Sequence, residues 1–364
     1  MRKALLAGLA GALVVTAAPA ATATTRPELP APTGPYAVGS TELHLVDHAR
    51  PDPWVAGTTR ELMVTVRYPA RPGGGPKAPY LTPGAAAIVA DEDARQLGIS
   101  ADRLDYTFPT HARTGAPAAG GPRPVVLYSP SAKYPRSVGT AQLEQLSSEG
   151  YVTVAIDHTH EAAAVEFPGG RVERRALPPG TDGKLVIATR VADVRFVLDE
   201  LELLSREGNP AGLSLDLTRV GMFGHSAGGF TTGETMVSDP RIDAGADLDG
   251  SMAYSQSARD FGRVANEGLD RPFLLLSAGD HSAASDASWQ EFLSHQRGPV
   301  RQAHLADGEH FSYTDYQALL PRLGLDPASI APFIGTIDAG RSIATQRASL
   351  SAFFARYVPR CDVR

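Results

Sequence analysis

The sequence is nearly free of cysteine, with Cys361, close to the C-terminus, as the single thiol among 364 residues. One cysteine cannot form an intramolecular disulfide, so a buried core has to stabilise the chain, and the chain is long enough to build a large one. We expect no catalytic role for this tail residue. The chain also lacks a basic excess, since its formal net charge is −6 at pH 7. Without a basic surface, nucleic acid is a poor candidate partner.

Cofactor signatures are missing as well. The chain contains no phosphate-binding loop, no dinucleotide-binding glycine fingerprint and no cysteine–histidine framework for a metal. In "DHTHEA", residues 157–162, His158 and His160 alternate, but no third ligand follows at a suitable spacing. We therefore expect no cofactor and no metal. The two histidines are predicted to be polar residues at the edge of a site or in a helix cap.

Long apolar runs are absent except at the N-terminus, in residues 1–23. Within this segment, Arg2 and Lys3 precede the apolar residues, and small residues in A-x-A patterns follow them. This order is typical of a secretory signal peptide cleaved after Ala20 or Ala23. A membrane anchor is the alternative, but small residues break the run and it ends in Pro19. No later run is long enough to span a bilayer. We expect a secreted protein without a stable membrane anchor.

Apolar strand-like segments alternate with helical ones through the rest of the chain. The long segment 184–204 and the last one, 341–358, carry apolar stripes at helical spacing. Continuous apolar runs are typical of strands buried on both faces of a parallel sheet. The alternation predicts an α/β fold, a doubly wound and mostly parallel sheet with helices on both faces. The predicted strands are 61–70, 124–130, 151–158, 219–226, 244–250 and 272–279.

The domain organisation predicted from these segments is simple. Residues 24–59 are expected to be an extended lead-in, and residues 60–364 a single domain. Segments 71–123 and 159–183 interrupt the alternation and are predicted to be insertions at the edge of the sheet. The second insertion contains "VEFPGGRV", whose Gly-Gly pair predicts a hairpin.

The stretch "VGMFGHSAGGF" carries the clearest chemical signal. Its Gly224-His225-Ser226-Ala227-Gly228 matches G-x-S-x-G between a predicted strand and a predicted helix. In that context the serine occupies a sharp, strained turn that exposes its hydroxyl at the edge of the sheet. The following helix points backbone N–H groups at any negative charge that forms there. A glycine-rich turn without chemistry is the alternative, and the strand–turn–helix context favours a nucleophile.

A serine nucleophile requires a base and an acid that orients the base, in the chain order Ser, acid, His for this architecture. His310 lies in the polar loop "LADGEHFSYTD" after the last apolar strand segment and is the predicted base. His304 alternates within that strand, His295 lies in a helical stretch, and His281 follows a strand end, where it could border the site.

Two acids compete for the third position. Asp249 ends "AGADLDG", and Asp280 ends "LLLSAGD" on the next strand. The commoner arrangement uses the later strand, but Asp280 could also simply cap the following helix. For the oxyanion hole, the backbone N–H of Ala227 is one predicted donor. The other is expected in the loop "SPSAKYPR", from Ser131 or Ala132.

These motifs together resemble the plasma-type platelet-activating-factor acetylhydrolases and related secreted bacterial lipases and esterases. The resemblance rests on "GHSAGG", on the "LDG" that follows, and on H-x-x-(Y/F)-x-D at His310, and it extends from about residue 60 to 357. It implies an α/β-hydrolase fold, Asp249 as the acid and His310 as the base. The family's "S-H-G" loop aligns Ala132 with its second oxyanion donor, where this chain has "SPSA".

The sequence therefore predicts a secreted serine carboxylic ester hydrolase, an esterase or lipase that acts through a Ser226–His310–Asp249 triad and an acyl-enzyme. Its expected substrate is a small-molecule or lipid ester. A serine peptidase or amidase would use the same triad, and a non-catalytic binding protein could retain the same scaffold. The length of the acyl chain depends on the two insertions and is not predicted.

Overall fold

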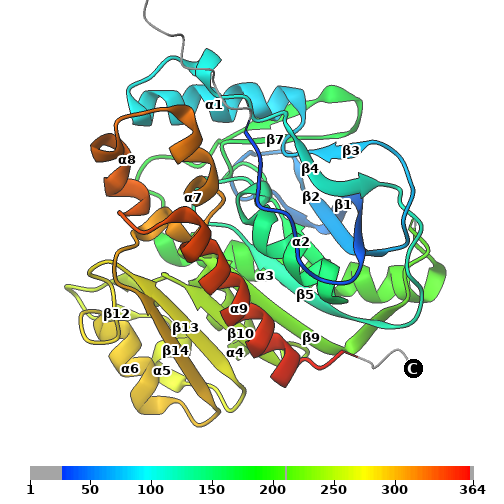
Figure 1. The fold of residues 1–364 in the computed structure, drawn as a ribbon. Helices are drawn as coiled ribbons and strands as arrows, with labels where there is room; N and C mark the ends of the chain where they lie inside the picture. Colours follow the sequence, from blue (N-terminus) through cyan, green and yellow to red (C-terminus); the bar gives the residue numbers. More distant parts are fainter. Residues whose placement is uncertain (1–26, 210, 361–364) are drawn as a thin grey trace, which may run out of the picture.

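A computed structural model describes residues 27–209 and 211–360 (Figure 1). The predicted signal peptide, residues 1–23, and Cys361 lie outside the described residues.

One large sheet organises the molecule, with ten strands in the order β14-β13-β10-β9-β5-β6-β2-β1-β4-β3. The strands from β6 to β14 in this order run parallel, whereas β2 is antiparallel to both β6 and β1. Each predicted strand overlaps an observed one, and the predicted α/β class is confirmed. The strand bounds are β1 Ala37–Pro51, β2 Thr59–Ala70, β3 Lys77–Pro79, β4 Pro109–Thr114, β5 Arg123–Ser129, β6 Val152–Ile156, β9 Leu215–His225, β10 Ala244–Leu248, β13 Phe273–Ala278 and β14 Val300–Leu305.

Strand β1 was not predicted, since residues 24–59 were expected to form an extended lead-in. It pairs with β2 along most of its length, from Ala37 opposite Ala70 to Asp47 opposite Arg60. Its burial alternates around Leu43 and Leu45, which are buried, while the neighbouring Glu42 and His44 are exposed. A strand with one solvated face carries only this alternation, a weaker signal than the continuous apolar runs of the central strands.

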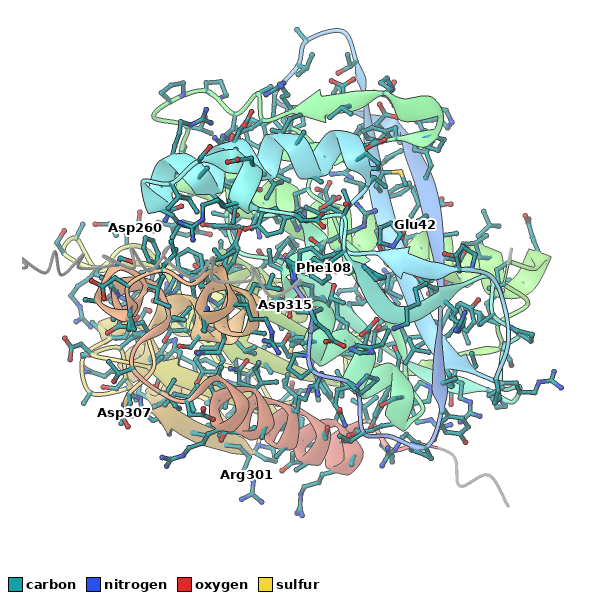
Figure 2. All side chains as sticks on the ribbon, turned by 45° about the horizontal axis from the view of Figure 1, so that its top comes forward. Glu42, Phe108, Asp260, Arg301, Asp307 and Asp315 are labelled. Carbon is teal, nitrogen blue, oxygen red and sulfur yellow. The ribbon has the colours of Figure 1, made fainter. Side chains whose placement is uncertain are left out.

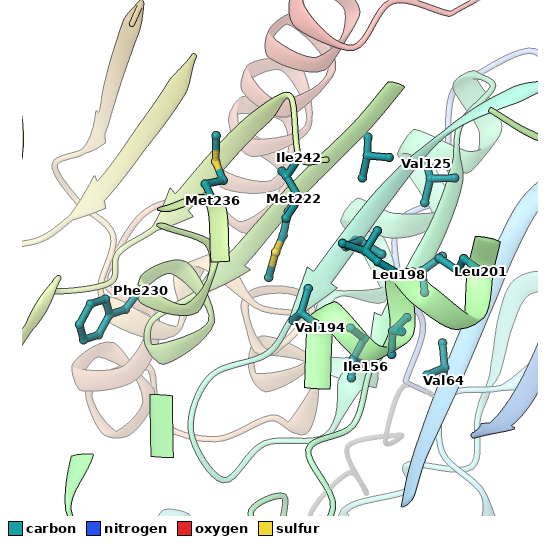
Figure 3. Packing of buried hydrophobic residues seen from close by; sticks show 14 of the residues in the cluster. Val64, Val125, Ile156, Val194, Leu198, Leu201, Met222, Phe230, Met236 and Ile242 are labelled. Carbon is teal, nitrogen blue, oxygen red and sulfur yellow. The ribbon is translucent and has the colours of Figure 1, made fainter. Parts of the chain in front are cut away.

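Helices cover both faces of the sheet, as predicted (Figure 1). On one face lie α3 Gly183–Glu207, α4 Ala227–Ser238, α5 Arg263–Glu267 and α6 Ala287–His295, and on the other lie α2 Thr140–Glu149 and α9 Ala339–Tyr357. The predicted apolar stripe of α3 is buried: Val194, Leu198 and Leu201 pack against Val125 and Met222 of the sheet (Figure 3). Full burial of each such side chain contributes roughly 1.5–3 kcal/mol.

Segments 71–123 and 159–183, predicted to be insertions, supply β3 and β4 at one end of the strand order and a separate two-stranded ribbon. The first contains β3, α1 Pro83–Leu97 and β4, and the second contains the predicted hairpin, β7 Ala164–Glu166 with β8 Val172–Arg174. Helix α1 packs in one apolar cluster with α7 Tyr316–Leu319 and α8 Pro327–Ile334 (Figure 1). A short ribbon, β11 Ala253–Ser255 with β12 Asp260–Phe261, follows β10.

Figure 2 shows the described side chains, with buried and exposed examples labelled. Phe108 is fully buried and the carboxyl of Asp315 is almost so, whereas Arg301 and Asp307 are exposed at the periphery. In the described part of the chain, no helix combines the length and the apolar character that crossing a bilayer requires.

Candidate active site

Ser226 stands at the sharp turn between β9 and α4. Its backbone has φ 56° and ψ −122°, a conformation that a residue with a side chain rarely adopts and that persists only where the surroundings enforce it. The flanking glycines permit the turn. A Cβ at Gly228 would lie 1.9 Å from the carbonyl oxygen of Ser129, and one at Gly224 would lie 2.2 Å from the carbonyl of Gly228. The strained serine therefore depends on two positions that no larger residue can occupy.

His310 is hydrogen-bonded to Asp249 through Nδ1, 2.7 Å from Oδ2. Asp249 follows β10 and has a positive φ of 59°, and its other oxygen, Oδ1, accepts the backbone N–H of Ala278 at 2.9 Å. Burial raises the pKa of Asp249, but hydrogen bonds from His281 and His310 outweigh it and lower that pKa to about 2. The carboxylate is therefore ionised at neutral pH and orients a histidine that is itself partly exposed.

The segment that carries His310 is anchored on three sides. The hydroxyl of Tyr313 donates to the carbonyl of Ser277 at 2.8 Å. The buried carboxyl of Asp315 accepts the N–H groups of Thr140 and Ala141 at the start of α2, at 2.9 and 3.0 Å. These two contacts give a structural reason for the H-x-x-Y-x-D pattern. Its Tyr bonds the loop to β13, and its Asp bonds the loop to the start of α2.

The third anchor is His225, the residue before Ser226. Its Nε2–H donates to the backbone carbonyl of His310 at 2.8 Å, and the two rings lie 4.5 Å apart. Burial, followed by the nearby His310, lowers the pKa of His225 to about 3, so it is neutral and acts as a donor. Sequence reasoning missed this residue, although its place inside G-x-S-x-G was a signal.

Ser226, Asp249 and His310 line one open cleft of about 530 Å³. Apart from Ala278 at the end of β13, the remaining residues of the lining have polar side chains and come from the segments that follow β10, β13 and β14. They include Ser251, Gln256, Asp280, His281, Ser285, Asp286 and Glu309.

Asp280, the competing acid, lies in the same cleft but is exposed. Its predicted role as a helix cap is wrong. The residue that caps α6 is Asp286, whose carboxylate accepts the N–H groups of Ser288 and Trp289. In the turn after β13, the hydroxyl of Ser285 donates to the carbonyl of Asp280, and α6 begins only at Ala287.

The other histidines considered as bases have different partners. His304 lies exposed on the edge strand β14 and pairs with Ser277, and His295 ends α6. His281 contacts Asp249 directly, through Nδ1 to Oδ1 at 2.8 Å. The sequence placed His281 at the edge of the site and gave no sign that it shares the carboxylate of Asp249 with His310.

The predicted oxyanion donors lie on segments that meet at the elbow. Ala227 is the first residue of α4, and Ala132 lies in the turn after β5. The approach of Gly228 to Ser129 brings the end of β5 against the start of α4. Arg190 of α3 contacts the turn after β5, where its Nη1 donates to the carbonyl of Pro130 at 2.7 Å.

The "DHTHEA" residues belong to buried ion pairs next to that turn. His158 bridges the hydroxyl of Ser129 and the carboxylate of Asp193, at 2.9 and 3.0 Å, and His160 contacts Asp52 at 2.9 Å. Both imidazoles are thus engaged by protein groups. Among the described residues, no group of three or more His, Cys, Asp or Glu side chains could hold a metal ion.

Several known proteins are similar to this chain. A probable 1-alkyl-2-acetylglycerophosphocholine esterase of Arthroderma benhamiae is 29% identical over 254 residues, which are 64% of this chain and 59% of that protein. The platelet-activating factor acetylhydrolase of Cavia porcellus is 22% identical over 325 residues, 79% of this chain and 69% of that protein. A solved structure, a ferulic acid esterase from Streptomyces cinnamoneus, superposes with a TM-score of 0.77 and 37% identity, covering 91% of this chain and 93% of that one.

No family model matches the chain. The resemblance predicted from "GHSAGG", "LDG" and the His310 motif is confirmed by these relatives. This chain spans only 59% of the length of the Arthroderma benhamiae esterase.

Proposed function

The chain belongs to the esterases of the α/β-hydrolase superfamily, and on that basis we propose that it is a secreted serine hydrolase that cleaves carboxylic esters at Ser226. The observation that carries this proposal is the joint placement of a strained serine and a carboxylate-bound histidine in one cleft. A serine hydroxyl is a weak nucleophile by itself, and a neighbouring base oriented by an ionised acid activates it.

In the proposed reaction, Ser226 Oγ attacks the ester carbonyl. Nδ1 of His310 is held by Asp249, so Nε2 is the nitrogen that takes the serine proton and returns it to the leaving alcohol. Asp249 keeps the imidazole in the required tautomer and stabilises the imidazolium that forms. Water, deprotonated by the same His310, then hydrolyses the acyl-enzyme and releases the acid.

The negative charge of the tetrahedral intermediate forms next to the start of α4. Backbone N–H groups at a helix N-terminus attract such a charge. We assign Ala227 as one oxyanion donor and Ala132 as the other. The support for Ala132 is the contact between the end of β5 and the elbow, with Arg190 holding the carbonyl of Pro130.

The lining of the cleft bears on the substrate. A long acyl chain requires an apolar channel, whereas this cleft presents Ser251, Gln256, Asp280, Ser285 and Glu309. We therefore propose esters with a short acyl group or a polar alcohol. Two relatives are named for removing an acetyl group from a phospholipid, which is a short acyl group on a polar and lipidic alcohol.

Esters of aromatic acids are a second candidate class. Beside His310, Phe311 lies 5.2 Å from Tyr134 and 6.4 Å from Phe333, measured between ring centroids. These rings, with Tyr316, border a hollow of only about 20 Å³, so an aromatic acyl group would lie against the rings and not inside the hollow. Flat acyl groups pack well against such rings. The solved structure that resembles this chain is named a ferulic acid esterase.

Secretion is the remaining part of the proposal and rests on the composition of residues 1–23. N-terminal sequencing of protein recovered from the culture medium should find a start between about Ala21 and Thr24. Protein recovered from the membrane with Met1 in place would contradict it.

A fluorophosphonate probe tests the proposed nucleophile. The purified chain should be labelled at Ser226, and Ser226→Ala should lose labelling together with ester hydrolysis, by about 10³-fold or more. Ser238→Ala, at the other end of α4, is the matched control, since within the described residues that hydroxyl bonds the carbonyl of Glu234 and nothing in the cleft. Near-normal turnover by Ser226→Ala would overturn the proposal.

A substrate panel then separates the alternatives. Acetyl, longer acyl and feruloyl esters distinguish the two ester classes, and matched amides identify a peptidase or amidase. Absence of both labelling and turnover in the folded chain would leave the non-catalytic binding protein.

A further inference from the structure

His281 occupies a position between two carboxylates. Its Nδ1 lies 2.8 Å from Oδ1 of Asp249, and its Nε2 lies 3.0 Å from Oδ2 of Asp286. The imidazole also packs on the indole of Trp289, with ring centroids 4.5 Å apart. Asp249 therefore contacts two histidines, His281 through Oδ1 and His310 through Oδ2.

This geometry determines the protonation of His281. A carboxylate oxygen only accepts hydrogen bonds, so two carboxylates facing the two ring nitrogens require a proton on each nitrogen. Partial burial lowers the pKa of His281, but the hydrogen bonds to Asp249 and Asp286 raise it to about 10. With both nitrogens engaged, His281 has none left to deprotonate Ser226 and is not a second base.

Resting on the proposed function, in which His310 is the base, we propose that His281 is a positioning residue for ester hydrolysis. As an imidazolium it holds Asp249 in the orientation that His310 requires and offsets part of the negative charge that His310 senses. Asp286 completes the arrangement, because it holds the far side of the ring and is itself fixed as the cap of α6.

Other charged groups around the two histidines are few and identifiable. Asp247 of β10 is near enough to act electrostatically on His281, and burial raises the pKa of Asp247 well above its usual range. On the cleft side, Asp280 and Glu309 line the same space. His310 also faces His225, which is neutral.

The consequence is a pH profile. The acid limb of kcat/KM reports the protonation of the base in the free enzyme. A cation on the far oxygen of Asp249 opposes a second positive charge on the base, so removing that cation should move the acid limb to higher pH. A single water-screened charge, acting through the shared carboxylate, should shift the limb by about 0.5–1 pH unit.

Two substitutions of the same residue separate charge from structure. His281→Gln retains a donor without the charge and should show the shifted acid limb. His281→Lys retains a cation and should keep the limb near its original pH, even if kcat falls. His304→Gln is the matched control, because that histidine lies exposed on β14 and bonds only a serine hydroxyl among the described residues.

An unshifted acid limb in folded, active His281→Gln would overturn the inference. For the case in which that variant does not fold, ¹⁵N NMR of the histidine-labelled, unmodified protein provides a second test. One imidazole should remain doubly protonated at pH 8 and should change in Asp286→Asn, and the absence of such a ring would equally overturn it. Failure of the proposed function is distinguishable, since it would appear as turnover by Ser226→Ala.

Discussion

Nδ1 of His310 lies 2.7 Å from Oδ2 of Asp249, although 61 residues separate the two in sequence. Strand β13 lies between β10, which Asp249 follows, and β14, which His310 follows. The turn after β10 bridges this gap, because the positive φ of Asp249 directs its side chain toward the end of β13, where Oδ1 accepts the N–H of Ala278. The earlier of the two competing acids thus reaches the histidine across a whole strand.

The first prediction compares the two acids. Asp249→Asn should reduce kcat by about 10⁴-fold, because the imidazole loses both its tautomer and the support for its charge. Asp280→Asn should change kcat by less than about threefold, since the exposed carboxylate is not bonded to His310 and caps no helix. Steady-state kinetics on a soluble acetyl ester, with circular dichroism to verify folding, measures both. Inactive Asp280→Asn with active Asp249→Asn would reassign the acid to the later strand.

The second prediction concerns the close approach at the elbow. In Gly228→Ala the new methyl would lie 1.9 Å from the carbonyl oxygen of Ser129, so the end of β5 and the start of α4 have to separate. Overpacking of this kind costs about 1–3 kcal/mol and should displace the oxyanion donors. We expect a lower Tm and at least tenfold slower labelling of Ser226.

Gly183→Ala is the control for this substitution. A Cβ there would meet only a ring atom of Tyr254, at an ordinary 3.7 Å, in the first turn of α3. Its Tm and labelling rate should match those of the unmodified protein. A Gly228→Ala variant with unchanged stability and labelling would show that the contact does not shape the site.

The third prediction uses a buried carboxyl outside the proposed triad. Asp93 of α1 accepts the hydroxyls of Tyr106 and Tyr316. Burial raises its pKa from 3.8 to about 6, although the two hydroxyls act in the opposite direction. Since the folded state holds this proton more tightly than the unfolded state, the contribution of Asp93 to stability falls as pH rises from about 4 to about 6.

Asp93→Asn removes this titration and can still accept both hydroxyls through its amide oxygen. The variant should therefore unfold at a higher Tm than the unmodified protein at pH 8, with a gain of at most about 3 kcal/mol for a shift of about two pKa units. The gain should disappear below about pH 3, where the carboxyl of Asp93 is protonated in both the folded and the unfolded state of the unmodified protein. A thermal unfolding series across pH checks this, and a loss of Tm at pH 8 would show that Asp93 is ionised and stabilising.

The fourth prediction is that activity needs no metal. A serine triad supplies the nucleophile, the base and the electrostatic stabilisation by itself. Turnover should be the same before and after dialysis against a chelator. A loss that added zinc restores would direct attention to His158 and His160, despite their contacts with Asp193 and Asp52.

Local patterns in the sequence determined the fold class and predicted the position of the proposed nucleophile. Continuous apolar runs identify buried parallel strands, and G-x-S-x-G between a strand and a helix needs only neighbouring residues to form its turn. The apolar stripe of α3 was equally readable, because a period of 3.6 residues is a property of the segment itself. Strand β1, half solvated and weakly patterned, marks the limit of this kind of reasoning.

Only the tertiary structure decided which of the residues around Ser226 are bonded to one another. Asp249 and Asp280 end neighbouring strands in equivalent sequence contexts, and the path of the turn after β10 brings one of them to His310. The roles of His225 and His281 also depend on contacts with residues far along the chain, namely the carbonyl of His310 and the carboxylates of Asp249 and Asp286. A hydrogen bond to a distant residue leaves no periodicity in the sequence, so the packing of the strand ends has to be seen before such partners can be assigned.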